Sequence, residues 1–474
     1  MIDKKTKIVC TIGPAVEKVE TMVELIKSGM DAARFNFSHG THEIHKRYLE
    51  NLNEACNISG RKVAIIQDLQ GPKIRVGMLK SGQIYLPEGN EIRITSDDVE
   101  GDEFLFSTTY PGFIQDLNEG ETLLLDDGNI KLEVTVVNPG KREITCRILT
   151  GGILKEHKGI NAPNTALSLP SLTEKDFKDL AFGIEHKFDF VAMSFVRTAD
   201  DIKLLKGIIK SQGKKTQVIA KIERPEAIIN IDAIIEEADV IMIARGDMGV
   251  EISTEEVPLL QKMIIKKCNE KTKPVITATQ MLESMIEAPT PTRAEASDIA
   301  NSILDGTDCV MLSAETSTGA YPIETVRTMK KIIMKTETIK PSTFFNDIFV
   351  EDSPENTLHT ICNSAVMIAV RVKAKVIITV TLGGISAILL SNHRPSAQIM
   401  AVSFEESVLK KMKLVWGVES MLMEYNDNVK DLEEQIKKRI LDNKLFDKGD
   451  RIVFVSRFPS MKDAAVNMIQ VSQL

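Results

Sequence analysis

Aromatic side chains are scarce in this chain of 474 residues, where 1 Trp, 5 Tyr and 17 Phe make up 5% of the total. RNA-binding surfaces built on stacked aromatic rings need more of them, so that class of protein is not expected. An excess of positive charge is also missing, because 59 Lys and Arg face 67 Asp and Glu and the formal net charge is −8. We therefore expect no general binding to nucleic acid or to an anionic membrane surface, and an anionic ligand must be met by a local cluster of positive groups.

Paired cysteines and long apolar runs are missing as well. The six cysteines form no CxxC pair, so the sequence offers no zinc or redox site of that kind. No run approaches the roughly 20 apolar residues of a membrane-spanning helix, and the N-terminal residues show no apolar signal-peptide segment. We expect a soluble, cytoplasmic protein with buried, reduced thiols and no membrane partner.

Eight short apolar runs alternate with stretches of helical spacing, such as 18–28, 42–57, 200–212 and 255–270. The runs lie at 6–12, 32–37, 63–69, 190–196, 218–222, 240–244, 275–278 and 310–313. Eight strand-then-helix units predict an α/β protein built on a (β/α)8 TIM barrel, although a doubly wound sheet would also fit this alternation. At roughly 150 residues per domain, the remaining length leaves room for further domains.

The third unit is interrupted by about 100 residues of short strands, with turn signals at 87–90, 118–120, 126–129 and 138–140. This pattern predicts an all-β module at 71–167, inserted between barrel segments 1–70 and 168–342 and placed to close over a site as a lid. A C-terminal α/β domain is expected at 343–474. Its predicted helices are 356–371, 386–393 and 429–443, and its predicted strands are 374–380, 398–402, 414–418 and 451–455.

Polar residues follow most of the predicted barrel strands. In a (β/α)8 barrel the carboxyl ends of the strands share one face, where active sites lie. The carboxylates Glu223 and Asp247 would converge there with two cations and several hydroxyls, and the needs of folding alone do not explain such a cluster. The residues are Arg34, Asn36, Ser38, Asp68, Lys221, Glu223, Gly246, Asp247, Thr279 and Ser313.

The pair Glu223 and Asp247 is suited to hold Mg²⁺, which takes one or two carboxylates and fills its other positions with water and substrate. Lys221 offers a point charge for a phosphoryl group, and the guanidinium of Arg34 matches phosphate geometry. Plainer alternatives exist. Lys221 and Glu223 would also make a buried ion pair, and Asp247 could cap the following helix.

Long strings in the sequence carry a resemblance to a known family. They are KTKIVCTIGP at 5–14, RFNFSHG at 34–40, KIERP at 221–225, ARGDMGVEI at 244–252, TATQMLESM at 277–285, PTRAEASDIA at 291–300 and LDGTDCVMLSAET at 304–316. In these strings, and nearly end to end, the chain resembles the pyruvate kinase family of bacterial type. This resemblance implies a TIM barrel, a β-barrel lid domain inserted at 71–167 and a C-terminal α/β domain. The resemblance implies a cytoplasmic phosphotransferase of glycolysis, usually a homotetramer, that moves a phosphoryl group from phosphoenolpyruvate to ADP and yields pyruvate and ATP.

The resemblance also implies residue roles. Glu223 and Asp247 would hold Mg²⁺ (or Mn²⁺), and Lys221 and Arg34 would stabilise the transferring phosphoryl group. The substrate carboxylate would be held by Gly246, Asp247 and Thr279, and the enolate would be protonated near Thr279 and Ser313. The positions that match nucleotide contacts are Asn36, Ser38, His39, Arg75 and Lys158.

Three departures from the family pattern matter. In the family, K⁺ is held at the positions of Asn36, Ser38, Asp68 and the carbonyl of Leu69, but Lys73 stands here where a glutamate is common. By this resemblance the Lys73 ammonium would replace K⁺, as in the K⁺-independent branch of the family. The side chains of Asn36, Ser38 and Asp68 are all retained, so weak K⁺ binding stays open as an alternative. A second departure is Ile44, which replaces a tyrosine beside the nucleotide and predicts looser base stacking.

The third departure concerns an effector site in the C-terminal domain. The hydroxyl-bearing turn 381–386 keeps Thr381, Gly384 and Ser386, whereas the partner loop 456–463 has Arg457 but no glycine. Two other functions remain open from the residues alone: a Mg²⁺-dependent lyase or aldolase for 2-oxo acids, and a catalytically silent scaffold that binds partners through its C-terminal domain.

Overall fold

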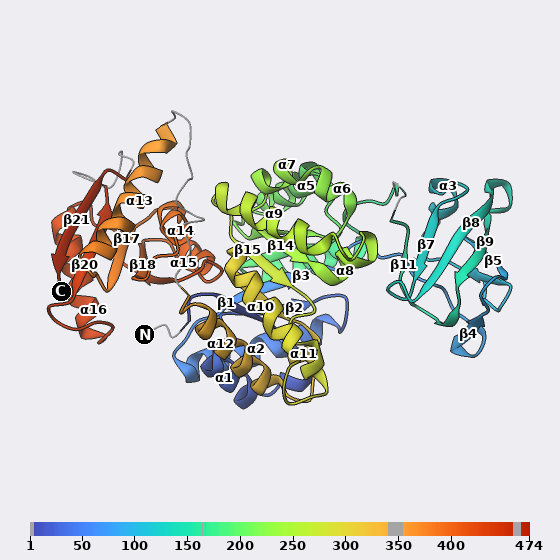
Figure 1. Ribbon diagram of the computed structural model, residues 1–474, viewed down its shortest axis with the longest axis horizontal. Helices are drawn as coiled ribbons and strands as arrows, with labels where there is room; N and C mark the ends of the chain where they lie inside the picture. The colour runs from blue at the N-terminus through green and yellow to red at the C-terminus, as the bar shows by residue number, and fades with distance from the viewer. Residues whose placement is uncertain (1–3, 164, 166, 340–353, 458–465) are drawn as a thin grey trace.

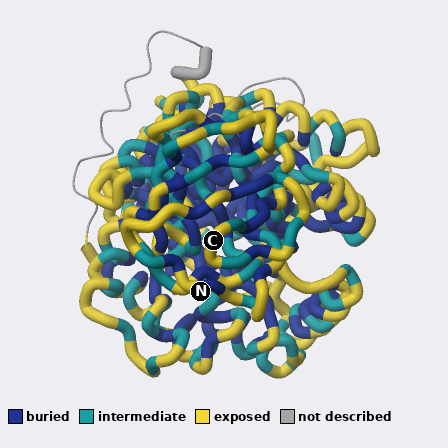
Figure 2. The backbone as a smooth tube through the Cα atoms, turned by 90° about the vertical axis from the view of Figure 1, so that its right-hand side faces the viewer, coloured by how far each residue is buried: buried dark blue, intermediate teal, exposed yellow. Residues whose placement is uncertain are grey.

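Three bodies lie in a row along the long axis of the computed structural model, with a β/α barrel in the centre, a β-rich insert on one side and an α/β domain on the other (Figure 1). The structure describes residues 4–163, 165, 167–339, 354–457 and 466–474. The predicted boundary at 342/343 lies outside these residues. Buried segments gather inside the bodies and exposed ones at their periphery (Figure 2).

The central body is a closed barrel of eight parallel strands in the order β1-β16-β15-β14-β13-β12-β3-β2. The (β/α)8 prediction is confirmed, the doubly wound alternative is wrong, and each predicted strand overlaps its observed one. The strands are β1 (Lys7–Thr11), β2 (Ala32–Asn36), β3 (Ala64–Asp68), β12 (Phe190–Met193), β13 (Gln217–Ile222), β14 (Val240–Ala244), β15 (Val275–Ala278) and β16 (Cys309–Leu312).

Helices surround the barrel because each strand has a second apolar face that must also be buried. A capping box begins helix α4, since Thr173 and Asp176 exchange side-chain-to-backbone hydrogen bonds. The helices are α1 (Val19–Ser28), α2 (His42–Ser59), α4 (Glu174–Glu185), α5 (Ala199–Ser211), α6 (Pro225–Ile229), α7 (Ile231–Glu237), α8 (Arg245–Glu251), α9 (Val257–Glu270), α10 (Arg293–Asp305), α11 (Ala314–Ser317) and α12 (Pro322–Thr336).

The insert between β3 and β12 consists mainly of strands around its own apolar core. It forms a six-stranded sheet in the order β11-β7-β8-β9-β5-β6 and a two-stranded sheet, β10-β4. The elements are β4 (Gln83–Leu86), β5 (Glu91–Thr95), β6 (Leu105–Ser107), the short helix α3 (Phe113–Asp116), β7 (Thr122–Leu125), β8 (Ile130–Asn138), β9 (Glu143–Thr150), β10 (Gly152–Lys155) and β11 (Ile160–Asn161).

The C-terminal domain has a five-stranded sheet in the order β19-β18-β17-β20-β21, in which only β21 is antiparallel to its neighbour. Its strands are β17 (Val376–Val380), β18 (Gln398–Ser403), β19 (Val418–Leu422), β20 (Arg451–Ser456) and β21 (Met468–Gln473). Its helices are α13 (Pro354–Arg371), α14 (Ile385–Asn392), α15 (Glu406–Met412) and α16 (Val429–Asp442).

The predicted strand at 414–418 is wrong, because β19 begins only at Val418. Leu414 instead packs among residues of the barrel interior, and its carbonyl oxygen lies 3.2 Å from Cys309 Sγ. The apolar character of Leu414 therefore comes from a contact between domains, whereas Val415 and Val418 pack in the core of the C-terminal domain. Helix α15 and strand β21 were not predicted.

The C-terminal domain covers the end of the barrel where the strands begin. Lys7, at the start of β1, donates through Nζ to the carbonyl oxygen of Val418 at 2.9 Å. Arg394 and Asp308, which precedes β16, form a buried ion pair of 3.2 Å. The opposite rim, where the strands end and the insert departs, is left for chemistry. Within the described parts of the chain, no helix is long and apolar enough to cross a membrane.

Candidate active site

Arg34 and Asp68 form the first link at the rim, from the ends of the adjacent strands β2 and β3. Arg34 Nε donates to Asp68 Oδ2 at 2.6 Å, and Nη1 donates to Thr11 Oγ1 at 3.0 Å. Both side chains are buried. Burial alone would raise the pKa of Asp68, but the charges of Lys221 and Arg34 hold it below its ordinary value.

Lys221 stands at the centre of the cluster. Its Nζ lies 2.9 Å from Glu223 Oε1 and 3.3 Å from Asp68 Oδ1, and it donates to Ser194 Oγ at 2.7 Å. Lys221 and Glu223 share one face of β13, because alternate residues of a strand point the same way. The predicted buried ion pair exists, and Asp68 joins it as a second carboxylate that the sequence did not pair with Lys221.

The electrostatics keep this lysine charged. Burial would lower the pKa of Lys221, but the negative charges of Asp68, Glu223 and Asp247 raise it above its ordinary value. The pKa of Glu223 is raised above its ordinary value. Burial raises it most, the positive charge of Lys221 lowers it, and the negative charge of Asp247 raises it further. Phe195 N donates to Glu223 Oε2 at 2.9 Å, so both carboxylate oxygens of Glu223 have partners.

Asp247 lies in the first turn of α8, which follows β14. Its side chain is exposed and makes no capping hydrogen bond, so the alternative of a helix cap is not borne out. The neighbouring Gly246 donates through its amide to Thr279 Oγ1 at 2.7 Å. This bond joins the ends of adjacent strands β14 and β15.

Thr279 adopts a left-handed backbone conformation with φ of 67°, which a β-branched residue rarely takes. Arg245 Nη2 donates to the Thr279 carbonyl at 2.7 Å, and Arg245 Nη1 donates to Asp298 Oδ2 at 2.7 Å. Arg245, which sequence reasoning passed over, therefore holds Thr279 in place. Ser313 follows the next strand, β16, and its amide donates to Glu315 Oε2 at 2.6 Å.

The residues matched to a K⁺ position lie at the ends of β2 and β3. Asn36 Oδ1 accepts a hydrogen bond of 3.1 Å from Ser38 N, and this bond closes a local turn at the end of β2. The Leu69 carbonyl oxygen accepts from Ser194 Oγ at 2.7 Å, so this predicted oxygen ligand already has a donor. Asp68 Oδ1 has no hydrogen-bond partner.

The cations matched to the nucleotide and K⁺ positions come from the loop after β3 and from the insert. The Lys73 ammonium makes no hydrogen bond or ion pair within the part of the chain that the structure describes. Arg75 Nη1 donates to the His157 carbonyl at 2.8 Å, and Lys158 Nζ pairs with Asp126 Oδ1 at 2.6 Å. Burial, then the charges of Arg75, Lys73 and Arg34, lower the pKa of His39.

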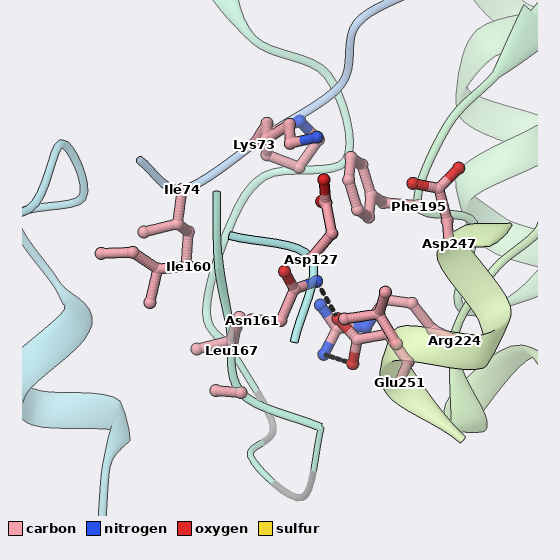
Figure 3. Close-up of a pocket in the computed structure, with 13 residues that line it drawn as sticks. Lys73, Ile74, Asp127, Ile160, Asn161, Leu167, Phe195, Arg224, Asp247 and Glu251 are labelled. Atoms are coloured by element: carbon pink, nitrogen blue, oxygen red, sulfur yellow. Dashed lines mark hydrogen bonds and ion pairs between the residues drawn. The ribbon is translucent and has the colours of Figure 1, made fainter. Parts of the chain in front are cut away.

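A cleft separates the insert from the barrel (Figure 3). Lys73, Asp127 and Asn161 line it from the insert side, and Asp247 and Glu251 line it from α8. The lining residues that sequence reasoning missed are Asp127, Asn161, Phe195, Arg224 and Glu251. Ser194 was missed too, although it directly follows β12, where a polar strand end could have indicated it.

The donor set fits a divalent cation held by few protein ligands. Glu223 and Asp247 are both carboxylates, and each raises the pKa of Lys221, which indicates electrostatic proximity. Asp247 makes no hydrogen bond or ion pair with another described residue. The described residues contain no group of three or more His, Cys, Asp or Glu side chains that could hold a metal. Two carboxylates completed by water and substrate match the preference of Mg²⁺.

The residues matched to an effector site lie far from the rim, in the C-terminal domain. Thr381 Oγ1 accepts from Gly384 N at 2.9 Å, and Ser386 Oγ lies 2.9 Å from Thr379 Oγ1. Both hydroxyl groups are buried and internally satisfied. Arg457 follows β20, but residues 458–463 of the partner loop lie outside the described residues.

Comparisons with known proteins agree along the chain. The family model "Pyruvate kinase, barrel domain" matches residues 3–326, and "Pyruvate kinase, alpha/beta domain" matches residues 359–472. A curated pyruvate kinase of Geobacillus stearothermophilus is 43% identical over 469 residues, which are 99% of this chain and 80% of the relative. One from Staphylococcus aureus (strain MRSA252) is 41% identical over 468 residues, again 99% and 80%.

Among solved structures, a crystal structure of a pyruvate kinase from Cryptosporidium parvum superposes with a TM-score of 0.92 at 36% identity. The match covers 99% of this chain and 96% of that one.

Proposed function

This chain belongs to the pyruvate kinase family, whose reaction moves a phosphoryl group from phosphoenolpyruvate to ADP, and we propose how its own residues perform that reaction. Such a transfer depends mainly on positioning and on stabilising the charge that spreads over the phosphoryl oxygens. The observation that carries the proposal is the buried cluster in which Lys221 contacts Glu223 and Asp68, and Asp68 contacts Arg34.

Lys221 and Arg34 bind the phosphoryl group of phosphoenolpyruvate from the barrel side. Lys221 stays charged because three carboxylates raise its pKa, so its ammonium can stabilise the transferring group throughout the reaction. The guanidinium of Arg34 is oriented by Asp68 and Thr11 before any substrate arrives. Preorientation of this kind removes reorganisation from the chemical step.

Glu223 and Asp247 would hold Mg²⁺ or Mn²⁺. When bound, the ion would supply positive charge that stabilises the negative charge developing on the substrate. Gly246, Asp247 and Thr279 hold the substrate carboxylate, and Thr279 and Ser313 lie where the enolate carbon receives its proton.

Asn36, Ser38, His39, Arg75 and Lys158 contact the nucleotide in this proposal, and the insert at 71–167 acts as a lid over it. The Lys73 ammonium supplies the fixed positive charge that K⁺ supplies in other members of the family. The position formed by Asn36, Ser38, Asp68 and the Leu69 carbonyl then works without K⁺. The free Lys73 ammonium and the occupied Leu69 carbonyl support this assignment.

Further proposals concern the whole molecule. We propose segments 1–70 and 168–342 as the barrel domain, 343–474 as the C-terminal domain, a homotetramer as the assembly and the cytoplasm as the location. An effector would bind near Thr381, Gly384, Ser386 and Arg457. A phosphate there must displace the hydrogen bonds that Thr381 and Ser386 now make. Activation by a sugar phosphate that is lost on combined Thr381→Ala and Ser386→Ala substitution would support the effector proposal.

A coupled assay of ATP formation from phosphoenolpyruvate and ADP tests the central assignment. We expect turnover with Mg²⁺ in tetramethylammonium buffer and none after chelation of divalent ions. Absence of ATP formation with any divalent cation would overturn the proposed site. Cleavage of carbon–carbon bonds in 2-oxo acids, with no phosphoryl transfer, would favour the lyase or aldolase alternative.

A further inference from the structure

The insert is joined to the rest of the molecule by very few polar contacts. Among the described residues, only one hydrogen bond or ion pair joins a side chain of 71–167 to a side chain outside that range. In it, Asn161 Nδ2 donates to Glu251 Oε1 at 2.6 Å (Figure 3). Three hydrogen bonds between a side chain and the backbone also cross this boundary, all at its two ends. Arg197 Nη1 donates to the Leu167 carbonyl at 2.9 Å, Ser168 N donates to Asp116 Oδ2 at 2.8 Å, and Gly71 N donates to Asp176 Oδ1 at 3.1 Å. Among the described residues, the Asn161–Glu251 bond is therefore the one link between two side chains at this junction.

Both ends of the bond lie on elements that bear residues of the proposed site. Asn161 ends β11, which pairs with β7, and the turn after β7 carries Asp126, the partner of Lys158. Glu251 ends α8, whose first turn carries Gly246 and Asp247. The bond therefore links the nucleotide side of the cleft to the helix that faces the substrate.

The surroundings of Glu251 make this bond both strong and reversible. Glu251 is 6% exposed, and a hydrogen bond to a buried carboxylate is stronger than one between neutral groups. Its other oxygen, Oε2, lies 4.0 Å from Arg224 Nη2, and neither of these two atoms has a hydrogen-bond partner. If Asn161 leaves, Arg224 can still pair with the carboxylate. Opening then costs one hydrogen bond and does not strand a buried charge.

We propose that Asn161 and Glu251 form a clamp that sets the position of the insert over the barrel rim, and that both act as positioning residues for nucleotide binding. Only the expected effect on ADP binding rests on the proposed function. The expected effect on the position of the insert holds whatever reaction the site performs.

Amide hydrogen exchange of the whole protein tests the structural part without substrates. The substitution Asn161→Asp places a carboxylate against Glu251, and Asn161→Ala removes the donor. Both are expected to speed exchange several-fold in peptides that cover 70–76 and 158–162, the segments next to the two crossings between insert and barrel. Asn118→Ala is the matched control, because Asn118 Nδ2 donates to Glu121 at 3.1 Å within the insert. It is expected to leave exchange at both crossings unchanged.

Steady-state kinetics test the effect on nucleotide binding, with a double variant in which the hydrogen-bond donor and acceptor of the clamp exchange places. Asn161→Asp is expected to raise KM for ADP about tenfold and to change KM for phosphoenolpyruvate little. Adding Glu251→Gln to Asn161→Asp reverses donor and acceptor, because the new amide can donate to the new carboxylate. This double variant is expected to recover slow exchange and most of the ADP affinity, which a merely destabilised fold would not do.

Each outcome decides the proposal. Exchange at both crossings that stays at the parent rate in Asn161→Asp and Asn161→Ala would overturn the clamp. Failure of the reversed pair to restore slow exchange would overturn it as well. If exchange behaves as expected but the parent forms no ATP, the clamp stands and the proposed function fails.

Discussion

Ser194 Oγ lies 2.7 Å from Lys221 Nζ and 2.7 Å from the carbonyl oxygen of Leu69. Because the ammonium is donor-only, the hydroxyl must accept from Lys221 and donate to Leu69. Ser194 is itself buried. It therefore ties the central lysine of the proposed site to the end of the neighbouring β3.

The first prediction concerns this tie. Ser194→Ala leaves Lys221 its two carboxylates but removes its third acceptor, so the ammonium can shift toward Glu223 or Asp68. We expect kcat to fall about 10- to 100-fold with little change in KM for phosphoenolpyruvate. Ser211→Ala, which removes an exposed hydroxyl on α5, is the control and should retain parent kinetics. A kcat within twofold of the parent would show that Ser194 does not orient Lys221.

A second prediction concerns Lys221 itself. Lys221→Met keeps the aliphatic stem and removes the charge, so phosphoryl transfer is expected to fall by at least about a thousandfold. Circular dichroism should remain that of a folded α/β protein. Lys206→Met, at a half-exposed lysine that pairs with Asp239 on the outside of the barrel, is the matched control. Near-normal turnover of the Lys221 variant would remove this residue from the mechanism.

The third prediction addresses the monovalent cation. Lys73→Glu removes the proposed substitute for K⁺ and introduces a negative charge at the same place. ATP formation by the parent is expected to be equal in K⁺ and tetramethylammonium salts, whereas the variant should need K⁺ for more than about nine-tenths of its activity. Lys155→Glu places the same charge change on an exposed strand of the insert and should not create a K⁺ requirement. A parent that is inactive until K⁺ is added contradicts the assignment of Lys73.

Strand periodicity and polar strand ends predicted the barrel and its rim well, because buried parallel strands such as β14 and β16 are continuous apolar runs. The same pattern predicted that Glu223 and Asp247 follow the barrel strands, and the structure has Glu223 directly after β13 and Asp247 in the first turn of α8; their chemical role stays a prediction. The predicted position of β19 was wrong because Leu414 packs against the barrel and is not part of a strand. A single sequence does not show which surface an apolar residue covers.

Contacts between residues that are distant in the sequence could not be predicted from local sequence patterns. The Asp68–Lys221 pair joins residues 153 positions apart (221 minus 68), and nothing near Asp68 in the sequence indicates its partner. Asn161 and Glu251 were missed because an Asn after a two-residue strand and a Glu at a helix end are individually ordinary. Their role depends on the packing of the insert against α8, which only coordinates reveal.

The last prediction concerns acid stability of the C-terminal domain. Burial, and then the charge of His359, lower the pKa of His393 from 6.5 to about 4. Between these two pH values the unfolded chain binds a proton that the folded chain does not, so the free energy of unfolding falls as the pH falls. The full effect, reached below pH 4, is roughly 3 kcal/mol for this one group.

Urea unfolding at pH 7 and pH 4.5 measures the effect. The fluorescence of Trp416, the sole tryptophan, reports on this region because its ring lies under Arg394, the residue after His393. The variant His393→Asn cannot take up the proton, so it should lose less stability than the parent between the two pH values. His157→Asn, at an exposed histidine of the insert, is the control and should lose as much as the parent. An equal loss in the His393 variant and the parent would mean that His393 titrates normally in the folded protein.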